Sequence, residues 1–437
     1  MPRVAASTPL TAPSPFRRVL AAEVASNFGA MLSRLAIPWL ATIALGATPW
    51  QMGLLLVADV AAAALGALLL GTWVDRLGKR QVMLACDVLR ALLLAALAVL
   101  TATGWIAWWM LAVAAAFSGL LTVCFELARS AWIAHHIAHA ELPARNAQLS
   151  IGSSLSETAA FALGGWLYQG LGAVVALVVD GLSYLVSALC LRRVPEAPLP
   201  AQHTAPAATT PWRERLQAFF SEALAGLVLV RQDRRLRALA QVQVWLALGL
   251  SLGGTSYMIF VTRELAVPTG WQGLVFAVGG LGAVAGAALA PRLGARWGSG
   301  GAMAAGLALL AVGAALVPAA AWAGLTGALV LLLAQQIVGD GGHAISEVHD
   351  RSLRQTLVPQ AMLARADAAI RSLEHTATLA GALFGGLLAS AIGVRQALML
   401  SALCYGIAAW QAMRRLRPGL ACPNVAPAAH PPGAPNA

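Results

Sequence analysis

The chain is a succession of apolar runs, most of them twenty to thirty residues long, separated by short loops that carry arginine. At a rise of about 1.5 Å per residue, about twenty helical residues cross the roughly 30 Å hydrocarbon core of a bilayer. Of the 437 residues, 59% are hydrophobic and only 11% are charged. A soluble domain carries about 25% charged residues. The pattern therefore predicts an all-α polytopic membrane protein whose main partner is the lipid bilayer.

Counting these runs predicts twelve transmembrane helices, six in each half of the chain. With the N-terminus inside, nearly all loop arginines fall on the cytoplasmic side, and only Arg263 and Arg395 fall outside. This asymmetry agrees with the positive-inside rule, so we expect both termini to be cytoplasmic. The expected spans are 17–46, 51–73, 81–103, 105–129, 147–169, 172–192, 237–262, 270–292, 301–321, 325–349, 368–390 and 393–416.

Composition divides the chain into five parts. Residues 16–194 and 236–417 are the apolar halves, each expected to fold as a six-helix bundle. Residues 195–235 between them are rich in Pro, Ala and Thr and then charged, which predicts a cytoplasmic linker with an amphipathic helix on the lipid surface. Residues 1–15 and 418–437 are Pro/Ala-rich and are expected to be disordered cytoplasmic tails.

Several functional classes are disfavoured. The net charge of +11 does not indicate nucleic-acid binding, because the cations lie in short loops where they orient a membrane protein. The five cysteines form no C-x-x-C pair, and no carboxylate accompanies the histidines at 135, 136 and 139 at a fixed spacing, so no metal site is predicted. We find no H-E-x-x-H, no G-x-S-x-G in a suitable setting and no Walker loop. We therefore expect neither an enzyme nor ATP coupling, and no cofactor.

The two halves of the chain repeat each other. Arg76-Leu-Gly-Lys-Arg80 recurs as Arg292-Leu-Gly-Ala-Arg296. Asn146 and Gly164 stand 18 residues apart, as do Asp367 and Gly385. Secondary transporters are built from such repeats around a binding site near the bilayer midplane. The duplication therefore predicts a transporter with two pseudo-symmetric bundles.

The stretch Gly71-Thr-Trp-Val-Asp75-Arg76-Leu77-Gly78-Lys79-Arg80 resembles motif A, the cytoplasmic loop signature of the major facilitator superfamily. Ser26-x-x-Gly29, Asp87-x-x-Arg90 and Asp180-x-x-Ser183-Tyr184 are similar to patterns of its macrolide- and enterobactin-exporter branch of drug:proton antiporters. The resemblance implies the major facilitator fold, a bacterial inner-membrane location and export driven by a proton gradient.

Two features depart from the antiporter pattern. Ala160–Gly165 lacks the proline of the fifth-helix signature Gly-Pro-x-x-Gly-Gly, and Ala114 stands where other drug antiporters have an arginine. These departures weaken the expectation of drug–proton antiport and leave the expected fold unchanged.

Four carboxylates are expected inside the membrane. Each costs about 2.5–3.5 kcal/mol on insertion scales, so each needs a partner or a function. Because burial favours the protonated form of a carboxyl group, all four are candidates for proton coupling. The alternative is a structural acid bonded to a neighbouring helix. The candidates are Glu157, Asp180, Asp340 and Glu374.

Two further groups of charges are candidates for the transport pathway. The motif A residues Gly71, Asp75, Arg76, Gly78, Lys79 and Arg80 are expected at an inner gate, where Arg76 and Arg80 would pair with Glu347, Asp350, Arg351 and Arg354 until the cavity opens inward. Arg34 and Asp59 lie at similar depth, so either they pair as a tether or Arg34 binds an anionic substrate group. Arg371, Glu374 and His375 share a helix face, either as a self-contained ion pair or as cavity lining.

These observations predict a monomeric secondary active transporter coupled to protons, and the family resemblance alone implies that it exports its substrate, an amphipathic small molecule such as a drug, macrolide or siderophore. We expect an apolar cavity wall with few buried charges, which suits a lipophilic substrate. Lysophospholipid flipping and metabolite uptake are alternatives within transport. A membrane-embedded sensor or enzyme is the rival from another class.

Overall fold

The computed structural model describes residues 15–138, 141–196, 228, 230–358 and 362–416. Both predicted tails and most of the predicted linker with its amphipathic helix lie outside these residues. Some side chains within helices also lie outside the description, namely those of residues 67–69, 71–73, 75, 76, 143, 363 and 364. The described part is almost entirely helical and contains no strand.

The N-terminal half contains five labelled helices and one π-helical turn. Long α5 is divided at Gly172, whose backbone (φ 80°, ψ 177°) is accessible to glycine and not helical. The division falls where the sequence predicts a break between two spans. The elements are α1 (Pro15–Trp39), η1 (Leu40–Ala44), α2 (Pro49–Arg76), α3 (Lys79–Ala102), α4 (Trp108–His136) and α5 (Leu142–Leu191).

The C-terminal half follows the same plan. Asp233 caps the first helix by accepting hydrogen bonds from the backbone N–H groups of Arg235 and Leu236. Gly298 (φ 70°, ψ 164°) divides α8, again where a break between spans is predicted. The elements are α7 (Arg234–Ile259), η3 (Phe260–Glu264), α8 (Thr269–Ala319), η4 (Ala320–Trp322), α9 (Leu325–Leu357), α10 (Leu363–Ile392) and α11 (Val394–Arg415).

Local backbone details recur at matching positions in the two halves. In each half the first helix ends in a five-residue π turn, η1 or η3. The next helix then begins at Pro49 or Thr269, five positions after that turn ends. A glycine with positive φ joins the last two segments of each half, Gly172 in one and Gly393 (φ 99°) in the other. This recurrence agrees with the duplication predicted from the sequence.

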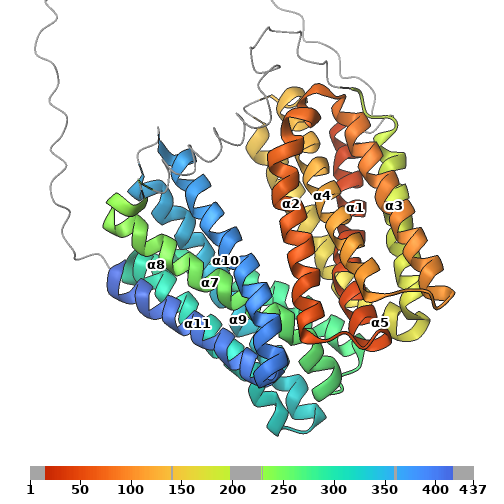
Figure 1. Ribbon diagram of the computed structural model, residues 1–437. Coiled ribbons are helices and arrows are strands. Elements are labelled where there is room, and N and C mark those ends of the chain that lie inside the picture. Colours follow the sequence, from red (N-terminus) through yellow and green to blue (C-terminus); the bar gives the residue numbers. More distant parts are fainter. Residues whose placement is uncertain (1–14, 139–140, 197–227, 229, 359–361, 417–437) are drawn as a thin grey trace, which may run out of the picture.

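The two halves form two helical bundles that meet at one end and diverge at the other (Figure 1). Helices α2 and α10 pack together across the boundary, and so do α5 and α8. At the diverging end lie the end of α2, the start of α3 and the start of α10 (Figure 1). The positive-inside rule predicts this end to be cytoplasmic.

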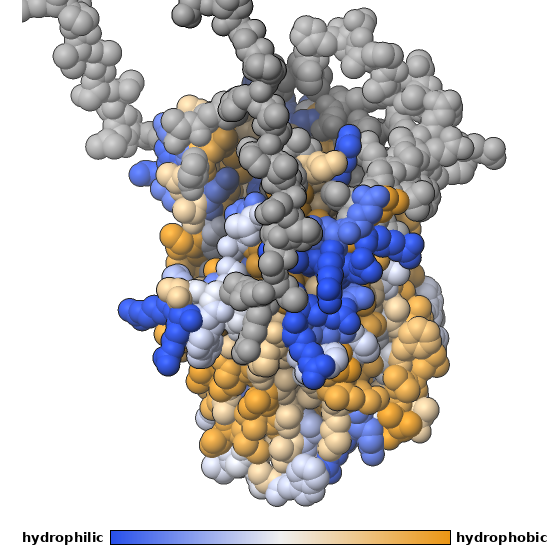
Figure 2. All heavy atoms as spheres, turned by 90° about the vertical axis from the view of Figure 1, so that its left-hand side faces the viewer, coloured by the Kyte–Doolittle hydropathy of each residue, from blue (hydrophilic) through white to orange (hydrophobic). Residues whose placement is uncertain are grey.

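Eight helical stretches of the described chain are long and apolar enough to span a membrane. Two of them, Ala144–Leu191 and Thr269–Trp322, are the stretches divided by glycine. α1 and α11, with 25 and 22 residues, are also long enough by length alone. The total of twelve spans stays a prediction. Apolar side chains cover much of the outer face in Figure 2, as expected for a surface in contact with lipid.

Candidate functional site

Glycines close the end at which the two bundles meet. A Cβ atom on Gly273 of α8 would lie 2.9 Å from Gly165 Cα of α5, and one on Gly53 of α2 would lie 3.3 Å from Gly386 Cα of α10. Real Cβ atoms rarely tolerate such approaches. The absence of side chains at these positions lets backbones from opposite bundles touch, as in other small-residue contacts between membrane helices.

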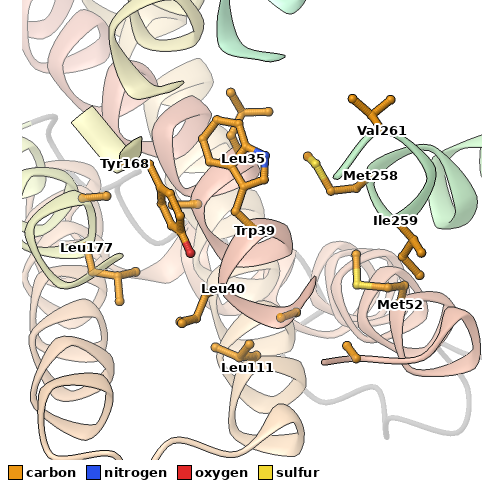
Figure 3. Close-up of a cluster of buried hydrophobic side chains, with 14 of the residues drawn as sticks. Leu35, Trp39, Leu40, Met52, Leu111, Tyr168, Leu177, Met258, Ile259 and Val261 are labelled. Carbon is orange, nitrogen blue, oxygen red and sulfur yellow. The ribbon is translucent and has the colours of Figure 1, made fainter. Parts of the chain in front are cut away.

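An apolar cluster fills the space beside these glycines. Figure 3 shows Trp39 of the first bundle lying opposite Met258 of the second, with Tyr168 and Met52 nearby. Trp39 is fully buried and donates a hydrogen bond from Nε1 to Gln272 Oε1 at 2.8 Å. Arg263 adds a second polar link, donating to the carbonyl oxygen of Thr42 at 2.7 Å. The closed end is therefore sealed by contacts that can separate without breaking either bundle.

A cavity of about 740 Å³ lies between the bundles and is open on one side. Its first wall comes from α1 and α2, and its second wall from α7, α9 and α10. The lining includes Gln355 and Asp367, which stand near the end of α9 and the start of α10 at the diverging end. The cavity therefore opens toward the end that the sequence predicts to be cytoplasmic.

The cavity wall is charged, and the expectation of an apolar wall with few charges is wrong. The reason is that the sequence pattern shows how many charges lie within the spans and not which helix faces turn toward one another. The charged residues lining it are Arg34, Asp59, Glu347, Asp350, Arg351, Arg354, Asp367, Arg371 and Glu374.

Arg34 and Asp59 both line the cavity on the side of the first bundle. Both are exposed, and they are close enough to interact electrostatically. No ion pair within 4.0 Å joins them among the described contacts, so they do not form the tether that was one of the two alternatives. The other alternative, a charge available to a substrate, agrees with this geometry.

Arg354 of α9 is the centre of a charge cluster at the cavity mouth. Its guanidinium lies 2.9 Å from Asp350, 2.6 Å from Glu374 and 3.5 Å from Asp367. Since Asp367 and Glu374 belong to α10, the cluster ties the two helices together. Arg354 is buried, so it neutralises carboxylates that water reaches only in part.

This cluster decides between the two interpretations of the α10 charges. Glu374 pairs with Arg354 of α9, so a self-contained ion pair of Glu374 with Arg371 is wrong. Arg371 and His375 are exposed and line the cavity, as the other interpretation expected. Sequence reasoning missed other lining residues, among them Gln243, His343 and Asp367. The sequence did single out Asp367 through its place in the internal repeat, but it gave no indication that Gln243 or His343 would line a cavity.

The motif A region has a partner that sequence reasoning did not find. Glu196 accepts a hydrogen bond from the backbone N–H of Arg80 at 2.9 Å and lies 3.5 Å from the Arg80 guanidinium. A Cβ atom on Gly78, the residue that precedes α3, would lie 2.9 Å from the Glu196 carboxylate, so glycine leaves room for it. Lys79 donates to the carbonyl oxygen of Val74 at 2.7 Å. A carboxylate at a helix N-terminus is stabilised by the free N–H groups there.

The expected inner-gate pairs are not formed in this conformation, as far as the described side chains show. Arg80 pairs with Glu196, Arg351 pairs with Glu347, and Arg354 pairs within its own bundle. Gly71, Asp75 and Arg76 lie in α2, and their side chains are outside the description. Because the gate is expected to separate when the cavity opens inward, its formation in another conformation stays a prediction.

Two of the four candidate proton-coupling carboxylates come from opposite bundles and interact. Asp340 of α9 is close enough to Glu157 of α5 for their charges to repel. Between them runs α8, where a Cβ atom on Gly280 would lie 3.3 Å from Thr158 Oγ1, and one on Gly279 would collide with the Asp340 carboxylate. Glycines on α8 thus leave room for the Asp340 carboxylate on one side and for Thr158, the residue next to Glu157, on the other.

Asp180 lies elsewhere, in the core of the first bundle. It is fully buried, accepts a hydrogen bond from the Ser33 hydroxyl and does not line the cavity. Nearby, buried Arg90 lies 3.7 Å from Asp87 and stacks on the Tyr184 ring with a centroid distance of 5.0 Å. The family-like patterns Asp87-x-x-Arg90 and Asp180-x-x-Ser183-Tyr184 therefore meet in one buried polar cluster.

Two helical bundles that enclose a charged cavity open at one end define a membrane transporter. The family model of the Major Facilitator Superfamily matches residues 19–373. The chain belongs to this superfamily. No curated protein matches the chain.

Solved structures share the fold at low sequence identity. The D323A mutant of the nucleoside transporter NupG is 15% identical with a TM-score of 0.70, over 92% of this chain and 99% of that one. A bacterial homologue of the iron transporter ferroportin in an inward-facing state is 16% identical (TM-score 0.68; 92% and 98% covered). A bacterial homologue of the human lysosomal transporter Spinster, inward-facing and unoccupied, is 14% identical (TM-score 0.65; 93% and 98% covered).

Proposed function

We propose that the protein is a secondary active transporter of the bacterial inner membrane that exports an amphipathic small molecule in exchange for protons. The observation that carries the transport part of this proposal is the cavity open at one end, between bundles that are held together at the other end by separable contacts, whereas export and proton exchange rest on the resemblance to the exporter branch. Substrate enters from the open end. The bundles then rock, the closed end separates, and the substrate leaves on the opposite side, as in alternating access.

Closing the open end requires new partners for the charges at its rim. The α9 residues Glu347, Asp350, Arg351 and Arg354 now pair with one another or with α10. When the bundles approach there, Arg76 and Arg80 of the motif A region come within reach of these carboxylates. Exchanging local pairs for pairs across the boundary keeps each charge neutralised in both conformations, which limits the cost of the change.

Glu157 and Asp340 are the pair best placed to couple this motion to protons. The like charges of Glu157 and Asp340 repel each other with α8 between them, and a proton on Asp340 removes the repulsion. Protonation therefore changes the energy of holding the two bundles together beside α8. Asp180 and Glu374 are less suited, because Asp180 lies away from the boundary and Glu374 neutralises Arg354.

The proposal is tested by dye and drug accumulation in an efflux-deficient bacterial host, with and without the protein and a protonophore. Lower accumulation that the protonophore abolishes supports proton-driven export. Lower accumulation that resists the protonophore contradicts proton coupling. Higher accumulation contradicts export and favours uptake. Expression must be verified in the membrane fraction before either result is interpreted.

A further inference from the structure

On the side of the first bundle, the cavity wall carries one positive and one negative side chain, Arg34 and Asp59. Arg34 precedes Trp39, the residue bonded to Gln272 at the closed end, by five positions. Asp59 follows Gly53, the residue packed against Gly386, by six positions. At about 1.5 Å per residue, both charges stand about 8–9 Å from the closed end. They form the deepest charged part of the cavity wall contributed by the first bundle.

The structure holds these two charges apart and leaves both available. The Asp59 carboxylate rests over α4, where a Cβ atom on Gly119 would lie 2.7 Å from Asp59 Oδ1. The Arg34 guanidinium has a contact with the Met31 sulfur at 4.0 Å, which does not neutralise it. In the described part of the chain no oppositely charged group within 4.0 Å pairs with either residue. An exposed, unpaired charge at membrane depth is a candidate for function.

Apolar side chains complete this part of the cavity. Leu56 and Val60 stand on the Asp59 helix, and Leu246, Ala247 and Leu250 face the cavity from α7 in the other bundle. Ser251 and Thr378 add hydroxyl groups. A ligand that fits this surface has an apolar body and two opposite charges.

We propose that the transported substrate is an amphipathic zwitterion, with its anionic group on Arg34, its ammonium group on Asp59 and its apolar body on the leucine-lined wall. A guanidinium binds a carboxylate or phosphate through paired hydrogen bonds, which orients that end. A ligand with one charge is disfavoured, because the residue that does not bind it repels it. This inference rests on the proposed transport function and names its substrate class.

The test is equilibrium binding to the purified full-length protein in lipid nanodiscs. The free-metabolite probes are leucine and leucyl-phenylalanine, which are zwitterions, with N-acetyl-leucyl-phenylalanine as the anion and leucyl-phenylalanine amide as the cation. Glycerophosphoethanolamine represents the zwitterionic headgroup of a phospholipid. The variants are Arg34→Gln and Asp59→Asn. Arg414→Gln is the control, because Arg414 is exposed and stacks on Trp410 away from the cavity.

We expect at least one zwitterion to bind tenfold or more tightly than a matched probe that lacks one of its charges. For the dipeptide, Arg34→Gln should remove the preference over the amide, and Asp59→Asn should remove the preference over the N-acetyl form. Arg414→Gln should leave both preferences unchanged.

One outcome would identify the zwitterion as a lipid headgroup. In that case only glycerophosphoethanolamine binds, at least tenfold more tightly than glycerol 3-phosphate, and its binding requires both Arg34 and Asp59. Equal binding of zwitterions and singly charged probes overturns the proposal, as does failure of every zwitterion to bind. Binding needs no proton gradient, so failure of proton-driven export leaves this result intact.

Discussion

Trp39 of α1 and Gln272 of α8 join the two bundles through one buried hydrogen bond of 2.8 Å at the closed end of the cavity. Gln272 is almost fully buried and also donates to the carbonyl oxygen of Val267 at 2.6 Å, which fixes its amide. A transporter must break its closed end in each cycle. A link made of a few hydrogen bonds, including the one from Arg263 to the Thr42 carbonyl oxygen, together with apolar packing and glycine contacts suits that requirement, since the net energy of each hydrogen bond is modest.

Replacing Trp39 with Phe should loosen the closed end. The change leaves the Gln272 side-chain oxygen with only the longer hydrogen bond from the Thr262 hydroxyl at 3.4 Å, a loss of about 1 kcal/mol in the conformation seen here. A loss of that size shifts the equilibrium toward the opposite conformation by about fivefold. Distance measurements between spin labels on the two bundles would report the shift. An unchanged distance distribution would show that the hydrogen bond does not influence the equilibrium.

A larger side chain at Gly273 should have the stronger effect. Valine there would meet Gly165 Cα, Gly165 N and the carbonyl oxygen of Phe161 at 3.0 Å or less, so α5 and α8 would have to separate. We expect transport to fall at least tenfold while the protein still inserts into the membrane. Gly254→Ala is the matched control, because nothing lies within 4 Å of the added methyl group. Equal activity of both variants would contradict a close-packed closed end.

Glu157→Gln and Asp340→Asn should each weaken proton dependence. Either change removes one of the two like charges that repel with α8 between them, so protonation no longer alters how the bundles pack beside α8. Transport into proteoliposomes, measured with and without an imposed pH gradient, should lose most of its response in both variants. A normal response in the two variants would move proton coupling to Asp180 or Glu374, which the same assay can examine.

The Arg354 cluster makes a prediction about stability. Arg354→Gln leaves Asp350, Asp367 and Glu374 unneutralised, which should lower the free energy of unfolding by about 3 kcal/mol. Adding Glu374→Gln should restore part of the loss by reducing the repulsion. Thermal unfolding of the detergent-purified variants would measure both the loss of stability in Arg354→Gln and its partial recovery in the double variant. Arg351→Gln is the control, because its pair with Glu347 is exposed and contributes less than about 1 kcal/mol.

Cysteine labelling tests the predicted orientation. Introduced cysteines at Thr103 and Ala266, which are exposed in short connections at the end where the bundles meet, should react with an impermeant reagent in intact cells. A cysteine at Thr378, which lines the cavity, should react only from the cytoplasmic side in this conformation. Protection of the first two together with labelling of the third from outside would reverse the predicted topology.

The sequence by itself determined the fold class and most element positions. Helix length and hydropathy placed most span limits within a few residues of the helix ends, including the breaks at Gly172 and Gly298, although α4 and α9 continue well past their predicted ends, to His136 and Leu357. They succeeded because a bilayer imposes its thickness on every spanning segment and forces its backbone to be helical. Motif A, whose central glycine is Gly78, indicated the superfamily, and the family match confirmed it.

The tertiary structure decided which charges meet. Sequence spacing relates residues on one helix, so it grouped Arg371 with Glu374, whereas packing places Arg354 of another helix against Glu374. In the same way, sequence spacing could not show that Glu196 caps α3 or that Arg34 and Asp59 remain unpaired in a charged cavity. The positions of these groups depend on how helices distant in sequence rotate and pack, and hydropathy contains no information about that rotation.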